Sequence, residues 1–255
     1  MEERIQQFLQ RTTVLIPAYN EVASLPGLLA EVRAHLPGAA ITVVDDGSAD
    51  GTADVAWACG ARVLRLPCNL GVGPAVQTGF RDALESGYDF LLRLDADGQH
   101  PPQEAQKLVA AMLQHPTDLV VGTRYGAGST YRGNWFRRVV LKGLAVFVSL
   151  ICRKRITDPT SGFWLVSRPL LRCFALHYPS DYPEAEAIAL LRRQGFSLEE
   201  IPVAFRPRQA GQSSLRAWGT VNFAAKVFLA LFVDRLRAVD PRGSAIFIKK
   251  GSGGA

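Results

Sequence analysis

The sequence predicts an α/β fold in which a mostly parallel, twisted sheet is flanked by helices. Between residues 12 and 124, short apolar runs alternate with segments of helical periodicity. This βαβα order is typical of parallel sheets that carry helices on both faces. Polar residues also follow the apolar runs where these end, which is where open α/β sheets bind their ligands.

The predicted strands are short β-branched or Leu-rich runs that end at Pro, Asp or Gly, a pattern expected of buried strands. They are residues 13–16, 41–44, 62–66, 90–94 and 118–122. The segments between them repeat apolar residues at helical spacing. They predict helices near residues 22–36, 51–59, 73–87 and 102–115.

Polar side chains follow four of these strands and are expected to meet at one edge of the sheet. They include Tyr19 and Glu21 after the first strand, Asp46 after the second, Asn69 (two residues before Gly71) after the third and Asp95 after the fourth. An acid in the position of Asp46 can accept a hydrogen bond from a base or a ribose. Gly71 opens a predicted helix and either cradles a phosphate or only shapes a turn.

Two carboxylates one residue apart, Asp95 and Asp97, end the fourth apolar run. Alternate residues of a strand share one face, so a strand reaching Asp95 would aim both groups into one volume. A divalent cation would relieve their repulsion, and oxygen ligands suit Mg²⁺ or Mn²⁺. A solvated turn is the alternative. For His100, a role in positioning this turn is preferred over metal ligation.

Composition narrows the classes of protein that the chain can represent. The 255 residues carry a net charge of +6, which favours anionic partners. Nucleic acid is disfavoured as that partner, because clustered acids repel phosphate. Four scattered Cys, no signal peptide and no apolar run of about 20 residues predict a cytoplasmic protein that does not cross a membrane.

Two strongly apolar segments with basic flanks, near residues 135–151 and 222–237, distinguish the later part of the chain. Such helices either lie in a membrane interface or form part of the core with charged ends in solvent. Residues 216–240 are therefore a possible interfacial helix, and residues 241–255 are expected to be a flexible tail.

Seven motifs in this order resemble the family 2 inverting glycosyltransferases of GT-A fold. The first four are residues 16–21, 45–52, 69–71 and 95–101, and the later ones are residues 122–125, 158–163 and 208–213. The later three resemble the branch that makes polyprenyl-phosphate sugars. The resemblance implies a single catalytic domain over residues 1–255, with a nucleotide-sugar half at 12–124 and an acceptor half at 125–215.

The resemblance also implies a role for each matching residue. Asp95, Asp97 and Gln99 would hold Mg²⁺ or Mn²⁺ at the diphosphate of a UDP- or GDP-linked sugar. Arg124 and Arg208 would contact phosphates of the donor or the acceptor. The nucleotide pocket would contain Pro17, Tyr19, Glu21 and Asp46, and the sugar pocket and closing loop would contain Asp158, Ser161 and Ser213.

The implied activity is metal-dependent transfer of a hexose or N-acetylhexosamine to polyprenyl phosphate at the cytoplasmic membrane face. Glu184 and Glu186 allow an alternative, since either could be the general base for a hydroxyl acceptor or only a helix-start acid. A nucleotide-sugar-binding or scaffold protein without catalysis is the third possibility. The chain departs from this branch in two ways. Ser214 stands where the branch usually has a Lys that contacts phosphate. The C-terminal transmembrane helices of many relatives are not found in the sequence, so an integral-membrane partner is possible.

Overall fold

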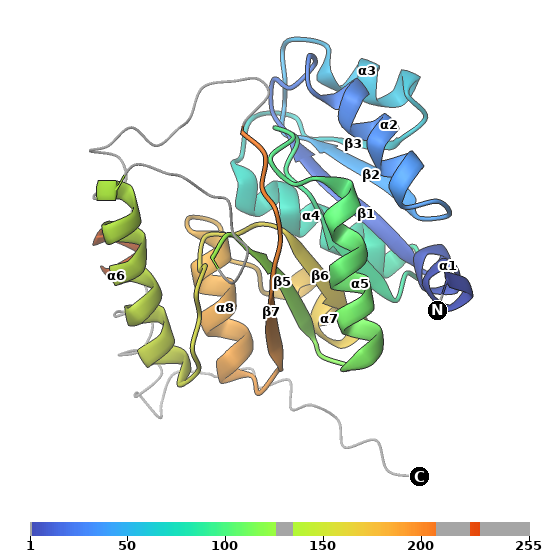
Figure 1. Cartoon of the computed structure of the whole chain (residues 1–255). Coiled ribbons are helices and arrows are strands. Elements are labelled where there is room, and N and C mark those ends of the chain that lie inside the picture. Colours follow the sequence, from blue (N-terminus) through green and yellow to red (C-terminus); the bar gives the residue numbers. More distant parts are fainter. Residues whose placement is uncertain (1, 126–134, 208–224, 230–255) are drawn as a thin grey trace.

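The computed structural model describes residues 2–125, 135–207 and 225–229 (Figure 1). The described strands form a seven-stranded sheet in the order β3-β2-β1-β4-β6-β5-β7. The strands are β1 Thr12–Ala18, β2 Ala40–Asp45, β3 Arg62–Arg65, β4 Phe90–Arg93, β5 Leu119–Thr123, β6 Trp164–Ser167 and β7 Leu198–Pro202. The five predicted strands are thus confirmed to within a few residues.

The helices between the first five strands were also predicted from the sequence. They are α2 Leu25–His35, α3 Thr52–Ala58, α4 Val72–Glu85 and α5 Ala105–Gln114, which the 3₁₀ turn η1 Pro102–Glu104 precedes. The remaining helices are α1 Glu2–Gln10, α6 Trp135–Cys152, α7 Arg168–Leu176 and α8 Pro183–Arg193. Of these, α1 and α7 were not predicted, nor were the strands β6 and β7.

The sheet is mostly parallel, as expected, but β6 runs antiparallel to both of its neighbours. Its first residue, Trp164, pairs with Arg93 of β4 on one side and with Val121 of β5 on the other. The run of four residues is short and fully buried. It brings the residues just before Trp164 close to the end of β4.

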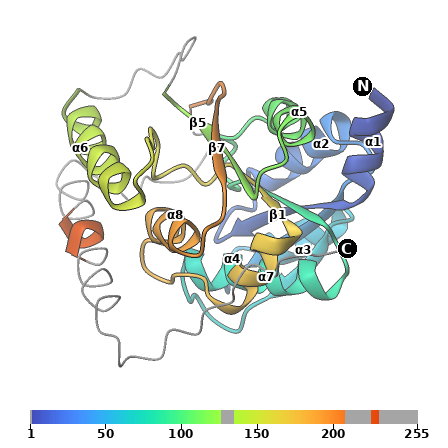
Figure 2. The ribbon, with the colours of Figure 1, turned by 90° about the horizontal axis from the view of Figure 1, so that it is seen from below.

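Helices cover both faces of the sheet (Figure 2). Alternate strand residues pack into two separate cores. Leu15 of β1 packs with α4, α7 and α8, whereas its neighbours Val14 and Ile16 pack with α1, α2 and α5. This alternation follows from the two-residue period of a strand. With both faces covered, the edge at the strands' carboxyl ends is left for polar groups.

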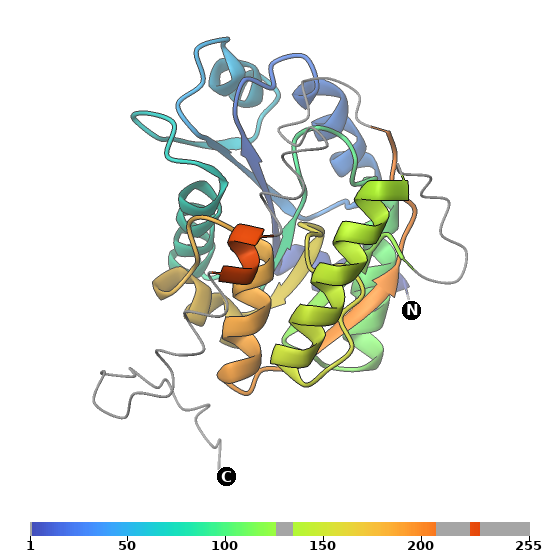
Figure 3. The ribbon, with the colours of Figure 1, turned by 90° about the vertical axis from the view of Figure 1, so that its left-hand side faces the viewer.

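Helix α6 packs beside α8 (Figure 3). It also carries an exposed apolar stripe. Val139, Val146 and Leu150 are 58%, 62% and 73% exposed. The short helical segment 225–229 lies against α6, where the rings of Phe147 and Phe228 stack at 4.0 Å between centroids. Within the described ranges, no helix is both long and apolar enough for a membrane crossing.

The rest of the predicted helix at 222–237 and the tail at 241–255 lie outside the described residues. The four Cys are free, as expected from their spacing.

Gly79 of α4 permits the close approach of that helix to the sheet. A Cβ atom at Gly79 would lie 2.2 Å from a methyl carbon of the buried Leu15. We expect Gly79→Ala to lower the free energy of unfolding by about 1–3 kcal/mol through overpacking. Gly27→Ala in α2 is the control, because a Cβ there meets nothing within 4 Å. It should raise stability by up to about 1 kcal/mol, and urea denaturation of both variants measures the difference.

Candidate active site

The turn after β4 carries the two carboxylates of the predicted metal site. The sequence had suggested that a strand reaches Asp95 and aims both carboxylates from one face. In the structure β4 ends at Arg93, so Asp95 and Asp97 lie in the turn itself. The N–H of Leu94 still donates to the Leu15 carbonyl at 3.0 Å, which keeps the chain beside β1. The Asp97 carboxylate accepts the N–H of Gln99 at 3.0 Å and closes the turn.

His100 positions the main chain of Asp95. Its Nδ1 accepts the N–H of Asp95 at 3.0 Å, and its ring is stacked on Phe163 with centroids 5.0 Å apart. Burial lowers the pKa of His100, so the ring is neutral near pH 7 and Nδ1 keeps the lone pair that this hydrogen bond requires. The geometry therefore supports the positioning role that the sequence favoured.

Basic side chains surround the Asp95 carboxylate. Its Oδ1 lies 3.3 Å from Nη2 of Arg93, and Nε2 of His100 lies 3.7 Å from Oδ2. Burial acts to raise the pKa of Asp95, but the nearby His100, Arg93 and Arg124 outweigh it and hold the pKa below its usual value.

The donor set of this turn fits a hard divalent cation. No three His, Cys, Asp or Glu side chains converge as a ligand group in the described part of the chain. The turn instead offers two carboxylates, Asp95 and Asp97, and the amide of Gln99. Mg²⁺ is commonly held by one or two carboxylates together with substrate phosphates and water. The set is thus suited to a metal that arrives with a diphosphate.

The loops after β1 and β2 are bound to each other. Asn20 adopts the left-handed region at φ 54°, and its N–H donates to Ser48 Oγ at 2.9 Å. The N–H of Glu21 donates to Thr52 Oγ1 at 2.9 Å. Pro17 is half-buried beside this contact, and Tyr19 remains 47% exposed. An exposed ring above two fixed loops is suited to stacking on a nucleobase.

Asp46 organises the loop that leads into α4. Its two carboxylate oxygens accept the N–H groups of Leu70 and Gly71 at 2.8 and 2.9 Å. Gly71, at φ 94°, precedes the first turn of α4. Asp46 is only 4% exposed, so in the described structure its carboxylate stabilises the loop. A contact with base or ribose remains a prediction.

The end of β5 and the loop before β6 form a second cluster. Arg124 binds the buried Asp158 carboxylate with two bonds, of 2.8 and 2.9 Å. The Ser161 hydroxyl donates to the Gly122 carbonyl at 2.6 Å. Arg124, Asp158 and Ser161 thus lie together in the structure, and Arg124 is also close enough to Asp95 to affect its pKa; their predicted roles toward phosphate and sugar remain predictions.

Several residues that shape the site were not identified from the sequence. The half-buried Glu200 carboxylate accepts the N–H groups of Thr157 and Asp158 and so orders that loop, and partial burial raises its pKa. The N–H of Arg206 donates to the Gln99 carbonyl at 3.1 Å. Among these residues, only Arg93 could have been found from the sequence, because it is a charged residue within an otherwise apolar strand.

The two candidates for a general base lie within the described residues, whereas two residues predicted from the later motifs do not. Glu184 lies in the first turn of α8, and its Oε1 is 2.7 Å from Nη2 of Arg93. Glu186 lies in the same turn and is half-buried. Arg208 and Ser213 lie outside the described residues, so their predicted roles remain predictions.

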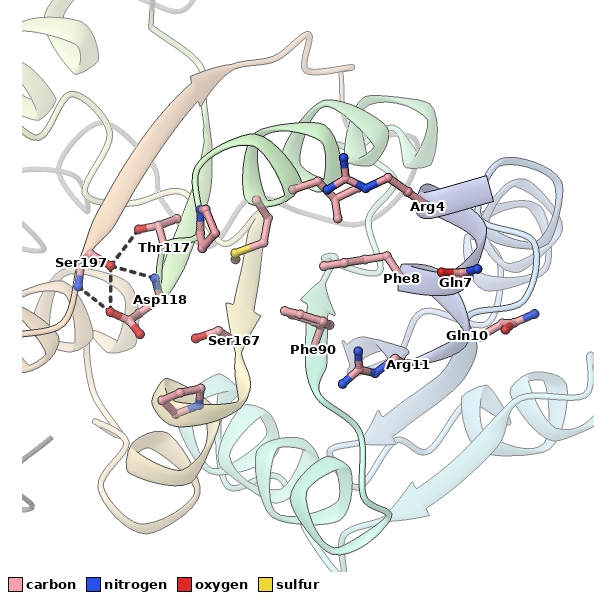
Figure 4. A pocket seen from close by; sticks show the side chains of 14 residues that line it. Arg4, Gln7, Phe8, Gln10, Arg11, Phe90, Thr117, Asp118, Ser167 and Ser197 are labelled. Atoms are coloured by element: carbon pink, nitrogen blue, oxygen red, sulfur yellow. Dashed lines mark hydrogen bonds between the residues drawn. The ribbon is translucent and has the colours of Figure 1, made fainter. Parts of the chain in front are cut away.

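A cavity of about 800 Å³ lies at the opposite edge of the sheet (Figure 4). Its walls come from α1, α5 and the residues at the amino ends of β4, β5 and β7. Asp118 is the only acid among the residues lining this cavity, and it bonds to Ser197 at 2.7 Å. Ligands of α/β sheets bind beyond the carboxyl ends of strands, so this cavity is not the candidate active site.

Comparison with solved structures identifies the fold. The glucosyl-3-phosphoglycerate synthase of Mycobacterium tuberculosis, crystallised with Mn²⁺, UDP-glucose and phosphoglyceric acid, superposes with a TM-score of 0.69. The alignment covers 89% of this chain and 83% of that one at 22% identity. Another crystal of the synthase contained Mg²⁺ and UDP. The predicted GT-A fold is thereby confirmed.

The chain belongs to glycosyl transferase family 2, whose pattern matches residues 13–174. It is 36% identical to polyprenol monophosphomannose synthase of Mycolicibacterium smegmatis, covering 81% of both chains. It is 32% identical to undecaprenyl-phosphate mannosyltransferase of Micrococcus luteus, covering 80% of this chain and 87% of that one. The resemblance found in the motifs is confirmed, and the protein is a family 2 glycosyltransferase.

The two hydrogen bonds of Asp46 predict a measurable effect on stability. Hydrogen bonds to a charged group contribute about 1.5–3 kcal/mol. We expect Asp46→Ala to lower the free energy of unfolding by about 2 kcal/mol, because the loop at Leu70 and Gly71 loses its acceptor. Asp54→Ala removes an exposed acid from α3 and should change stability by less than about 1 kcal/mol. Equal effects in urea denaturation would contradict the assignment.

Proposed function

We propose that the protein moves a hexose or N-acetylhexosamine from a UDP- or GDP-linked sugar to polyprenyl phosphate, with inversion at the anomeric carbon. The similarity to two bacterial proteins named for mannosyl transfer to such lipids, over four-fifths of the chain, carries the proposal. The acid turn after β4 and the arginine at the end of β5 support it, because both suit a phosphate-rich pair of substrates.

In the proposed reaction, a phosphate oxygen of the acceptor forms a bond to the anomeric carbon while the bond to the diphosphate breaks. Asp95, Asp97 and Gln99 would hold Mg²⁺ or Mn²⁺, which supplies electrostatic stabilisation of the leaving group. Arg124 presents a planar guanidinium to phosphate oxygens, and Arg208 is proposed to do the same. A phosphate acceptor is already anionic, so its attack requires no general base.

The membrane contact is proposed to be the exposed stripe of α6. Val139, Val146 and Leu150 form this stripe, and the exposed Arg138 and Lys142 flank it. Apolar residues beside basic ones are typical of helices that lie in an anionic membrane interface. Peripheral binding at the cytoplasmic face would bring the site to the phosphate of a lipid acceptor.

The activity is tested by incubating the protein with labelled UDP- and GDP-sugars and Mn²⁺. Undecaprenyl phosphate in vesicles and a panel of hydroxyl compounds serve as acceptors. We expect mass spectrometry to show a lipid-phosphate sugar and chelation to suppress it. Asp97→Ala should abolish transfer while circular dichroism shows an intact fold. Transfer only to hydroxyl compounds, or binding of donor without turnover, would refute the proposal.

The membrane contact predicts a loss of vesicle binding on charge insertion. Burying one Leu or Val side chain contributes about 1.5–3 kcal/mol, and about 1.4 kcal/mol is tenfold in affinity. The pair of changes Val146→Glu and Leu150→Glu should therefore weaken sedimentation with anionic vesicles at least tenfold. Leu176→Glu is the matched control, since Leu176 is 60% exposed on α7. Equal losses in both proteins would contradict the assignment to α6.

A further inference from the structure

A buried arginine connects the metal-binding turn to α8. Arg93 is 1% exposed at the end of β4. Its Nη2 lies 2.7 Å from Glu184 Oε1 and 3.3 Å from Asp95 Oδ1, and its Nη1 donates to Tyr178 at 3.2 Å. The guanidinium carbon also lies 5.7 Å from the centre of the Trp164 ring. One nitrogen is therefore shared by two carboxylates from segments about 90 residues apart in the chain.

The backbone around this contact leaves it little freedom. A Cβ atom at Gly162 would lie 3.0 Å from Nη2 of Arg93 and 3.1 Å from Oδ1 of Asp95. The loop before β6 thus packs directly on the Arg93–Asp95 pair because residue 162 has no side chain. The antiparallel pairing of Arg93 with Trp164 holds this loop in place.

The electrostatics determine what each partner can do. A buried cation without a counterion is strongly unfavourable, and Glu184 and Asp95 supply the negative charge beside Arg93. Removing one partner from a buried ion pair leaves the other charge uncompensated. The Glu184 carboxylate is thus already engaged as a counterion of the buried Arg93. Without Glu184, Arg93 would interact more strongly with Asp95 and compete with a metal for it.

We propose that Arg93 is a positioning residue, which orients Asp95 toward the metal, and that Glu184 is its counterion and not the general base. The assignment rests on the proposed glycosyl transfer and narrows it, because it leaves the acceptor to supply its own charged nucleophile. It also makes the start of α8 a determinant of metal affinity, although α8 contributes no ligand to the proposed metal set.

The test compares Glu184→Gln with the wild-type protein. Binding of Mn²⁺ in the presence of UDP or GDP is followed by electron paramagnetic resonance, which needs no turnover. Loss of a group that orients a metal ligand typically weakens binding about 10–100-fold. We expect the dissociation constant for Mn²⁺ to rise about tenfold and the turnover rate at saturating Mn²⁺ to stay within tenfold of wild type. Asp181→Asn, which removes an exposed acid just before α8, should leave both values unchanged.

A double variant keeps the test valid if the single change disturbs folding. Arg93→Met with Glu184→Leu replaces the pair by apolar side chains, an exchange that buried ion pairs often tolerate. We expect it to fold, as judged by thermal unfolding, and to bind Mn²⁺ at least tenfold more weakly.

Two results would overturn the inference. One is unchanged Mn²⁺ affinity in both variants. The other is a turnover rate of Glu184→Gln that falls about a hundredfold or more at saturating Mn²⁺, which is the effect expected of a missing general base. Failure of the wild type to glycosylate undecaprenyl phosphate would refute the proposed function alone, because the Mn²⁺ measurements do not depend on that acceptor.

Discussion

A guanidinium placed at the buried end of a central strand needs negative charge close by, and this need organises the site around Arg93. The charge comes from Asp95 in the next turn and from Glu184 at the start of α8. Supplying it requires β6 to lie beside β4 and requires Gly162 to leave space for the pair. The acid turn, the loop before β6 and the α7–α8 connection therefore depend on one another.

The loops that are proposed to bind the donor are organised by a different principle, in which acids and hydroxyls bond to backbone N–H groups. Asp46 holds the loop before α4, and Ser48 and Thr52 hold the loop after β1. Because the backbone is fixed by these contacts, Tyr19 stays exposed without the loop losing its shape. Loops that are already ordered in this way lose less conformational freedom on binding a ligand.

Much of the fold could be predicted because its first half is locally encoded. The runs that became β1 to β5 are apolar, short and bounded by turn residues. Prediction failed for β6 and α7, since Trp164–Ser167 and Arg168–Leu176 adjoin without a turn signal between them. The strand β7, with the sequence Leu-Glu-Glu-Ile-Pro, is too polar for a strand pattern. Its pairing with β5 is a tertiary contact.

The sequence by itself determined the chemistry that gathers at the sheet edge, because strand order and turn residues place Asp46, Asp95, Asp97 and Arg124 at carboxyl ends. The sequence did not show which hydrogen bonds and ion pairs those groups form. Only the tertiary structure decided that Asp46 is bonded to a loop, that His100 accepts from Asp95, and that Glu184 is paired with Arg93. Hydrogen bonds and ion pairs between residues far apart depend on packing distances, and spacing along the chain does not contain them.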